Sequence, residues 1–331
     1  MTWEQHNADQ QSRYTSTGPR ILYHPDAIAN LRAGRNHPVT MHIMPTERCN
    51  LNCTFCSVGE RNHYPDLPLE WILSVVNALE DRGLKAVILS GGGEPMLYRH
   101  INELLSYLCG KFEVGVITNG TVLHKMDTAL LNRLTWVRVS ANTLDYLDKL
   151  ELPVFTNGTT LGLSYIWHEY STLETAGRIT DLAARSKAKY IRLVPDCTVS
   201  TEELEKAHEK LHSLAQYFGP PWFHQYKIHK APAECHLGRI HPVLYADGLV
   251  YPCDSLVLNS PRTDRRFRAE YAMCRWDEVA EFFDRPIAGS LLDTKICPHC
   301  IFWPQNEILT DLINKVDVPL PNHPTENTNF V

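Results

Sequence analysis

The sequence lacks the long apolar segments that enter or cross membranes. None of its 331 residues lies in a run that approaches 18 uninterrupted apolar residues, and the polar residues 1–14 contain no signal-peptide core. A basic excess is also missing, because 32 Lys and Arg face 38 Asp and Glu and leave a net charge of −6. These absences disfavour nucleic-acid and membrane partners. They predict a cytoplasmic protein that acts on a small molecule or a peptide.

Internal repeats and low-complexity segments are absent as well, and the 16 histidines include no HExxH pair. What is present is enough apolar sequence, 44%, to bury the core of one large domain with a smaller appendage. Ten cysteines accompany it. Because thiols stay reduced in the cytoplasm, these cysteines predict metal binding or catalysis rather than a disulfide framework.

Short apolar runs alternate with helical patterns between residues 40 and 218. The predicted strands are Thr40–Met44, Ala86–Ser90, Val114–Thr118, Trp136–Ser140, Thr160–Tyr165 and Tyr190–Val194. The predicted helices are Leu69–Arg82, His100–Cys109, Met126–Leu134, Thr143–Leu150, Leu173–Ser186 and Thr201–Phe218. Six alternations indicate an α/β fold with a parallel sheet, for which we expect a partial (β/α)6 TIM-like barrel. Its functional loops should follow the carboxyl ends of the strands.

The remaining segments predict three further units. Residues 1–39 form an amino-terminal extension with one short helix near Ala27–Ala33. The barrel covers residues 40–218 and ends where Gly219-Pro220-Pro221 breaks the helix. A small second domain covers residues 219–316, with a hairpin at Pro242–Cys253 and short helices at Trp276–Arg285 and Glu307–Lys315. Residues 317–331 have the composition of a disordered tail.

Cys49, Cys53 and Cys56 form a C-x3-C-x2-C pattern directly after the first predicted strand. A [4Fe–4S] cube binds four thiolates, one on each iron, so three cysteines leave one iron open to an external ligand. The alternative is a zinc site completed by His42 or His63.

This pattern resembles the radical S-adenosylmethionine (SAM) superfamily, whose motif is C-x3-C-x-aromatic-C with the aromatic residue here supplied by Phe55. The family's GGEP element corresponds to Gly92, Gly93, Glu94 and Pro95 after the second strand. Thr118 and Asn119 follow the third strand, and Ser140 and Asn142 follow the fourth. The resemblance implies a [4Fe–4S] cluster with an open iron that binds SAM, and it implies that these loop residues contact SAM.

A second cysteine set lies at Cys235, Cys253, Cys297 and Cys300. Four thiolates can fully ligate a second cluster, and a four-cysteine zinc ribbon is the alternative. The run from Cys235 through Gly248 to Cys253, followed by Cys297-Pro-His-Cys300, resembles the SPASM and twitch extensions of radical SAM enzymes. That resemblance implies a twitch-like Fe–S domain with one auxiliary [4Fe–4S] cluster.

The implied chemistry is reductive cleavage of SAM, which needs an external electron donor of flavodoxin or ferredoxin type. The resulting 5′-deoxyadenosyl radical would abstract hydrogen from a sugar, aminocyclitol or nucleoside. Oxidation of an alcohol, with the auxiliary cluster as electron acceptor, is the first hypothesis. The alternatives are an epimerase that uses Cys197 or Cys274 as hydrogen donor, a peptide-modifying enzyme, and a zinc protein without catalytic activity that has a structural or nucleic-acid-binding role.

Overall fold

The computed structural model describes residues 1–15, 19–142, 147–227, 229–259, 267–298, 300–320 and 325–331. The strands are β1 (Thr40–Ile43), β2 (Ala86–Leu89), β3 (Glu113–Thr118), β4 (Trp136–Ser140), β5 (Thr160–Trp167), β6 (Tyr190–Pro195), β7 (Trp222–His224), β8 (Val243–Leu244), β9 (Leu249–Tyr251) and β10 (Cys274–Arg275). The α-helices are α1 (Trp3–Tyr14), α2 (Pro25–Arg32), α3 (Leu69–Glu80), α4 (Ile101–Leu108), α5 (Thr128–Leu131), α6 (Leu173–Ser186), α7 (Thr201–Phe218), α8 (Val279–Asp284) and α9 (Trp303–Ile313).

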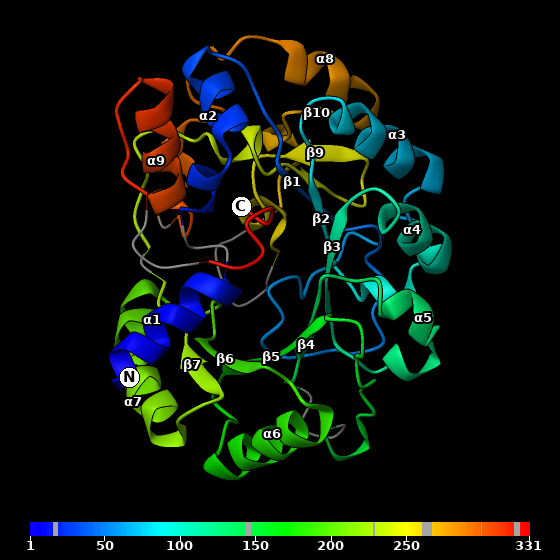
Figure 1. Cartoon of the computed structure of the whole chain (residues 1–331), viewed down its shortest axis with the longest axis vertical. Helices are drawn as coiled ribbons and strands as arrows, with labels where there is room; N and C mark the ends of the chain where they lie inside the picture. Colours follow the sequence, from blue (N-terminus) through cyan, green and yellow to red (C-terminus); the bar gives the residue numbers. More distant parts are fainter. Residues whose placement is uncertain (16–18, 143–146, 228, 260–266, 299, 321–324) are drawn as a thin grey trace.

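One sheet connects all ten strands, in the order β10-β9-β8-β1-β2-β3-β4-β5-β6-β7. Strand β8 pairs with β1 in parallel, and every neighbouring pair from β1 to β7 is parallel as well. Strand β9 pairs antiparallel with β8 on one side and with β10 on the other. Figure 1 shows this sheet curving around the molecule, with α3, α4, α5, α6 and α7 along its outside. The order ends at β10 and β7, so the barrel is open rather than closed.

The two faces of the sheet have different partners, because successive strand residues point to opposite sides. Val87, Val116 and Val137 belong to the main apolar core under the outer helices. Helix α3 contributes Ile72, Val75, Val76 and Leu79, which recur on one helical face. Alternate residues such as His42, Ile117 and Arg138 instead line an inner cavity. The inner face therefore combines charged and apolar side chains around one cavity.

The predicted α/β class with a mostly parallel sheet is confirmed. All six predicted strands form, with ends that agree to within two residues, and β4 matches its prediction at both ends. The predicted helix at Thr201–Phe218 is α7, which begins at the Ser200 and Glu203 capping box. The hairpin around Asp247-Gly248 is present as β8 and β9.

The structure contains a strand and a helix that the sequence analysis did not predict. A further parallel strand, β7, follows the Gly219-Pro220-Pro221 break, and its three residues are too few to produce a periodic pattern. Helix α1 was also missed, because its sequence is polar. It forms because Asn7 bonds both backbone groups of His224 in β7, at 2.7 and 3.1 Å, and because Tyr14 stacks on Tyr190 at 4.2 Å.

The predicted helix at Thr143–Leu150 is also different from expectation. Its described part is a 3-10 turn at Leu147–Lys149, and residues 143–146 lie outside the described part of the chain. The predicted helix at Met126–Leu134 is shorter in the structure, with four α-helical residues in α5.

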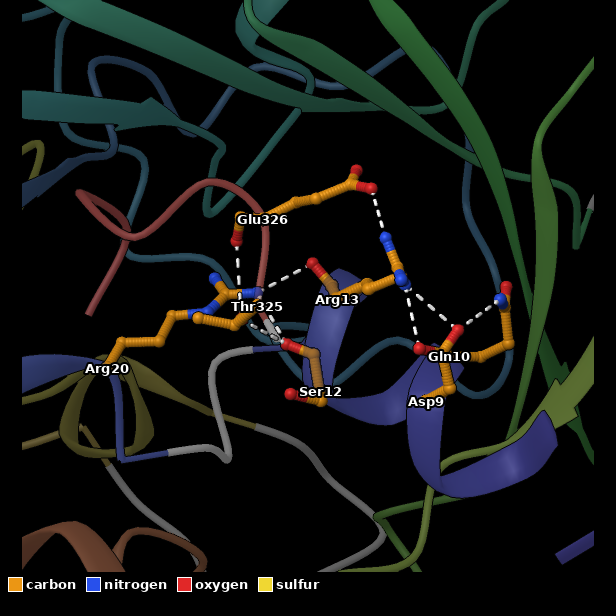
Figure 2. Close-up of polar contacts among 7 residues, drawn as sticks. All are labelled: Asp9, Gln10, Ser12, Arg13, Arg20, Thr325 and Glu326. Atoms are coloured by element: carbon orange, nitrogen blue, oxygen red, sulfur yellow. Dashed lines mark hydrogen bonds and ion pairs between the residues drawn. The ribbon is translucent and has the colours of Figure 1, made fainter. Parts of the chain in front are cut away.

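The expectation of a disordered tail is wrong for residues 325–331. Phe330 and Val331 are buried, and Phe330 packs edge-on against Trp136 at 5.2 Å. Figure 2 shows how the tail joins α1: Glu326 pairs with Arg13, and Thr325 donates a hydrogen bond of 2.8 Å to the carbonyl of Ser12. Asn329 and Val331 bond Thr40, the first residue of β1, so the tail lies at the amino ends of the strands. The polar composition of the tail gave no local signal for these long-range contacts.

Among the described residues, no helix is both long enough and apolar enough to span a membrane.

Candidate active site

The predicted SAM-cluster cysteines lie together in the loop between β1 and α3. The amide of Cys56 bonds the carbonyl of Cys53 at 3.1 Å, which bends the loop back on itself. Burial raises the pKa of the Cys49 thiol and raises that of Cys53 to about 11, and the proximity of Cys56 adds to both shifts. The three thiols are therefore close enough to interact electrostatically, and three thiolates are what a cluster with one open iron needs.

Two buried carboxylates hold the start of this loop, and sequence reasoning missed both. Asp66 accepts two bonds from Arg48, at 3.0 and 2.7 Å, and a third from the Thr46 hydroxyl. Glu47 accepts hydrogen bonds from the Tyr245 hydroxyl and, at 2.9 Å, from the backbone amide of residue 64. Only the fold brings these partners together, since Tyr245 lies 198 positions further along the chain.

Arg61 is a further residue that the motifs did not indicate. Its Nε donates to the carbonyl of Gly92 at 2.9 Å, and its Nη2 lies 3.8 Å from the Cys56 sulfur. The guanidinium thus connects the cysteine loop with the glycine-rich loop. A cation next to a thiolate ligand stabilises the negative charge of that ligand.

The backbone of the glycine-rich loop after β2 packs directly against the backbone of the cysteine loop. A Cβ on Gly93 would lie 2.1 Å from the carbonyl oxygen of Arg48, and one on Gly92 would lie 2.7 Å from the Tyr245 hydroxyl. Only glycine fits these positions, which leaves backbone groups uncovered for a ligand. Pro95 begins the short 3-10 turn that follows.

Glu94 has an internal role that differs from the predicted contact with SAM. Its buried carboxylate accepts hydrogen bonds from the Thr118 hydroxyl at 2.5 Å, the Asn119 amide at 2.6 Å and the Met96 amide at 3.1 Å. Burial raises its pKa, and these three bonds act in the opposite direction. Glu94 therefore holds the loops after β2 and β3 together.

The other predicted loop residues lie at the carboxyl ends of their strands. Asn119 donates to the Asn50 side chain at 2.9 Å, which ties the β3 loop to the cysteine motif. The side-chain oxygen of Asn142 accepts a hydrogen bond of 2.8 Å from the backbone amide of Ile166, and Ser140 pairs with Ser164 across β4 and β5. Phe55 stacks on His168 after β5, with ring centroids 4.5 Å apart. These residues thus surround one end of the sheet, as predicted.

The second cysteine set also comes together. Cys235, Cys253, Cys297 and Cys300 line one small apolar cavity beside Leu237 and Phe302. Burial raises the pKa of Cys235 to about 12 and raises the pKa of Cys253 well above its ordinary value, and neighbouring thiols of the set contribute to both shifts. A donor set of four thiols fits a fully ligated [4Fe–4S] cluster.

Four thiols that line one cavity can ligate either a [4Fe–4S] cluster or a zinc ion, and a metal count distinguishes the two.

A larger polar cavity of about 220 Å³ lies on the inner face of the sheet, and Cys253 lines both cavities. Leu237 and Phe302 are shared in the same way. His42 and His241 also line the larger cavity, and burial lowers the pKa of each to about 4, so both are neutral near pH 7. The second cysteine set is thereby in direct contact with a cavity of metabolite size.

The two candidate hydrogen donors lie in different places. Cys197 follows β6 and is near Lys227, which lines the larger cavity. Cys274 in β10 packs against the main core on the outer face of the sheet, and its thiol is near Glu278 and Arg285. Cys274 lines neither cavity, so its position gives no support to the hypothesis that it donates hydrogen.

Comparisons with known proteins agree with this site. Residues 43–159, which contain the cysteine and glycine-rich loops, match the model of the radical SAM superfamily. The chain is 33% identical over 107 residues to a GTP 3′,8-cyclase of Syntrophomonas wolfei, covering 29% of this chain and 32% of that protein. It is 26% identical over 183 residues to an S-adenosylmethionine-dependent nucleotide dehydratase of Selenomonas ruminantium, covering 53% of this chain and 65% of that protein.

The fold is similar to that of Streptococcus suis SuiB bound to S-adenosylmethionine. The TM-score is 0.56 at 16% identity, over 80% of this chain and 70% of that chain. At this identity the likeness concerns the fold alone. The chain spans about a third of the length of the Syntrophomonas wolfei cyclase and of a second one, from Archaeoglobus fulgidus. By its sequence match and its cysteine loop, the region of residues 43–159 is a radical SAM domain, and the fold of the chain is similar to that of SuiB.

Proposed function

We propose that this protein oxidises an alcohol of a small polar metabolite bound in the inner cavity. The observation that carries the proposal is the position of Cys253, which lines the substrate-sized cavity and the four-cysteine cavity at once. An oxidation must remove a second electron after the first hydrogen atom. A cluster on Cys235, Cys253, Cys297 and Cys300 would supply an acceptor for that electron at the edge of the cavity.

The cysteine loop supplies the first step. Cys49, Cys53 and Cys56 would hold the cluster to which SAM binds, and together these groups would supply the radical chemistry that removes hydrogen from an unactivated carbon. The residues of this chain hold and orient the reactants. Arg61 joins the cysteine loop to Gly92, and Glu94 fixes the adjoining loops through Thr118 and Asn119.

The size of the cavity supports a metabolite such as a sugar, aminocyclitol or nucleoside. About 220 Å³ is small for a peptide chain but suits one or two rings. The relatives named GTP 3′,8-cyclase and nucleotide dehydratase are named for nucleotides, which belong to the same general class of polar metabolites. An electron donor of flavodoxin or ferredoxin type would reduce the first cluster.

The test is a metal count combined with SAM cleavage. Protein purified without oxygen should contain about eight irons with matching sulfide and, with dithionite and SAM, should release 5′-deoxyadenosine. Cys53→Ala should lose about four irons and all SAM cleavage. The double variant Cys297→Ala and Cys300→Ala should lose about four irons yet retain SAM cleavage.

Cys274→Ala is the matched control, because Cys274 is a half-buried thiol outside both cavities, and it should retain every iron. Zinc without iron in the wild-type protein would overturn the proposal. A normal iron content in the Cys297 and Cys300 variant would remove the auxiliary cluster and the oxidation mechanism with it.

Epimerisation is the second candidate, and the position of Cys197 near Lys227 favours it. An epimerase returns a hydrogen atom to the substrate radical from a thiol. When a substrate is known, solvent deuterium at the reacting carbon in D2O, lost in Cys197→Ala, would establish epimerisation and exclude the oxidation.

A further inference from the structure

The inner cavity carries more positive than negative charge. Its lining includes five basic side chains, from Arg13, Arg20, Arg138, Arg192 and Lys227, whereas Asp254 is the one acidic residue among those described in the lining. His42 and His241 are neutral, as shown above. A buried charge is stable only when it is paired or hydrogen-bonded, so each cation needs a partner.

Two of the five cations are already compensated at the tail end of the cavity. Arg13 pairs with Asp9 and with Glu326. Arg20 donates to the carbonyl oxygens of Ser12 at 3.1 Å, Arg13 at 2.7 Å and Phe330 at 2.9 Å. Figure 2 shows both arginines engaged between α1 and the tail segment, where they serve structure.

Of the other three cations, Arg192 and Arg138 bond neutral groups. Arg192 donates to the Ser164 hydroxyl at 2.8 Å and to the Gln225 side-chain oxygen at 2.9 Å. Arg138 donates to the Tyr190 hydroxyl at 3.1 Å and to the carbonyl of Tyr14. Within the described part of the chain, no ion pair joins Arg138, Arg192 or Lys227 to a carboxylate.

These three cations also repel one another. Burial lowers the pKa of Lys227 to about 8, and the charges of Arg192 and Arg138 lower it further while Asp254 opposes them. Burial and Arg138 lower the pKa of Arg192 to about 9. One carboxylate among three cations leaves a net charge of about +2 in a low-dielectric cavity, which attracts an anion strongly.

We propose that Arg138, Arg192 and Lys227 bind an anionic group of the substrate, a phosphate or a carboxylate; this rests on the proposed function. Arginine and lysine are the side chains that recognise these anions. Arg138 lies two residues before Ser140, and Arg192 lies three residues before the end of β6, so both are deeper in the sheet than the loops at the strand ends. An anion held there directs the rest of the substrate toward the cysteine loop.

The experiment is calorimetric titration of the cluster-loaded protein, at low ionic strength and without reductant, with inorganic phosphate and separately with acetate. The wild-type protein should bind at least one of them, and the preferred anion identifies the chemical class. Arg192→Gln and Lys227→Gln should each weaken binding by about tenfold or more. Arg192→Lys, which retains the charge, should recover part of the loss and guards against a folding defect.

Arg275→Gln is the control, since Arg275 is exposed and pairs with Asp277, and it should bind as the wild type does. The inference is overturned if neither anion binds, if all variants bind equally, or if saturating SAM displaces the anion. Iron content and 5′-deoxyadenosine are measured on the same samples. If the protein contains no iron but binds the anion in a charge-dependent way, the proposed function is wrong and this inference stands. If the protein carries its clusters and cleaves SAM but binds no anion, this inference is wrong and the proposed function stands.

Discussion

Gly93 determines how closely the glycine-rich loop approaches the cysteine loop. In Gly93→Ala, the added methyl group would lie 2.1 Å from the carbonyl oxygen of Arg48, so one loop must move. Because displacement of about 1 Å at a reacting centre costs on the order of 100-fold in rate, we expect SAM cleavage to fall by about that factor. The measurement is 5′-deoxyadenosine formation with dithionite.

Gly177→Ala is the matched control for this prediction. Gly177 lies inside α6, where an added Cβ meets nothing within 4 Å. It should leave SAM cleavage unchanged and stabilise the helix by about 0.5–1 kcal/mol. Equal SAM cleavage in both variants would contradict the close approach of the two loops.

Arg61 is expected to tune the first cluster through the Cys56 sulfur. Arg61→Gln removes a positive charge whose Nη2 lies 3.8 Å from that sulfur. Because a nearby cation favours the state that carries the extra electron, the reduction potential of the SAM cluster should fall. A redox titration followed by electron paramagnetic resonance measures this, with the exposed Arg275→Gln, whose partner is Asp277, as control. An unchanged potential would show that Arg61 only joins the loops.

At the scale of elements, the tail segment 325–331 contributes to the stability of the sheet. Phe330 is 2% exposed and packs against Trp136 at the start of β4. Phe330→Ala should lower the free energy of unfolding by about 3–5 kcal/mol, the usual cost of truncating a buried phenylalanine. Denaturant unfolding tests this. Tyr217→Ala, at a side chain that is 77% exposed, should change stability by about 0.5 kcal/mol or less.

Helix α7 and strand β7 share a buried histidine pair that makes stability depend on pH. His208 Nδ1 and His224 Nε2 lie 2.9 Å apart. Burial lowers the pKa of His208 to about 4 and that of His224 to about 3, and the neighbouring His208 and His212 lower the latter further. Both rings are therefore neutral in the folded protein, while the unfolded chain takes up protons near pH 6.5.

The contribution of this histidine pair to the free energy of unfolding is present in full above about pH 6.5 and is lost as the pH falls toward about 4. Replacing both histidines with leucine should flatten the decrease in melting temperature between about pH 7 and pH 5. Melting curves recorded by circular dichroism at each pH decide this. Parallel decreases in the wild type and the double variant would show that these histidines do not titrate on unfolding.

At the scale of the whole molecule, one sheet crosses the domain boundary proposed at residue 219. Strand β8 pairs with β1, and the amide of Val39 bonds the carbonyl of Ile240 at 2.8 Å. A fragment of residues 1–218 would expose the edges of β1 and β6, which invites aggregation. We expect it to lack a cooperative melting transition, in contrast to the full chain, in differential scanning calorimetry. A sharp transition would instead establish residues 1–218 as an independent unit.

Local patterns predicted much of this fold and part of the candidate site. The strands between Thr40 and Pro195 are apolar runs whose character depends on nearest neighbours in sequence, so they were found. The cysteine loop was found because its three thiols are close in sequence. Arg61, Asp66 and Tyr245 were not found, because each acts through partners that carry no local signal.

The sequence by itself determined the alternation of strands and helices, the spacing of the cysteines and the caps that begin helices such as α7, since all of these depend on residues a few positions apart. Only the tertiary structure decided that Cys253 lines two cavities, that Cys274 lines neither, and that three cations face one carboxylate. These features depend on strand register and on which side of the curved sheet a residue faces. Contacts between distant segments set both, and local periodicity does not encode them.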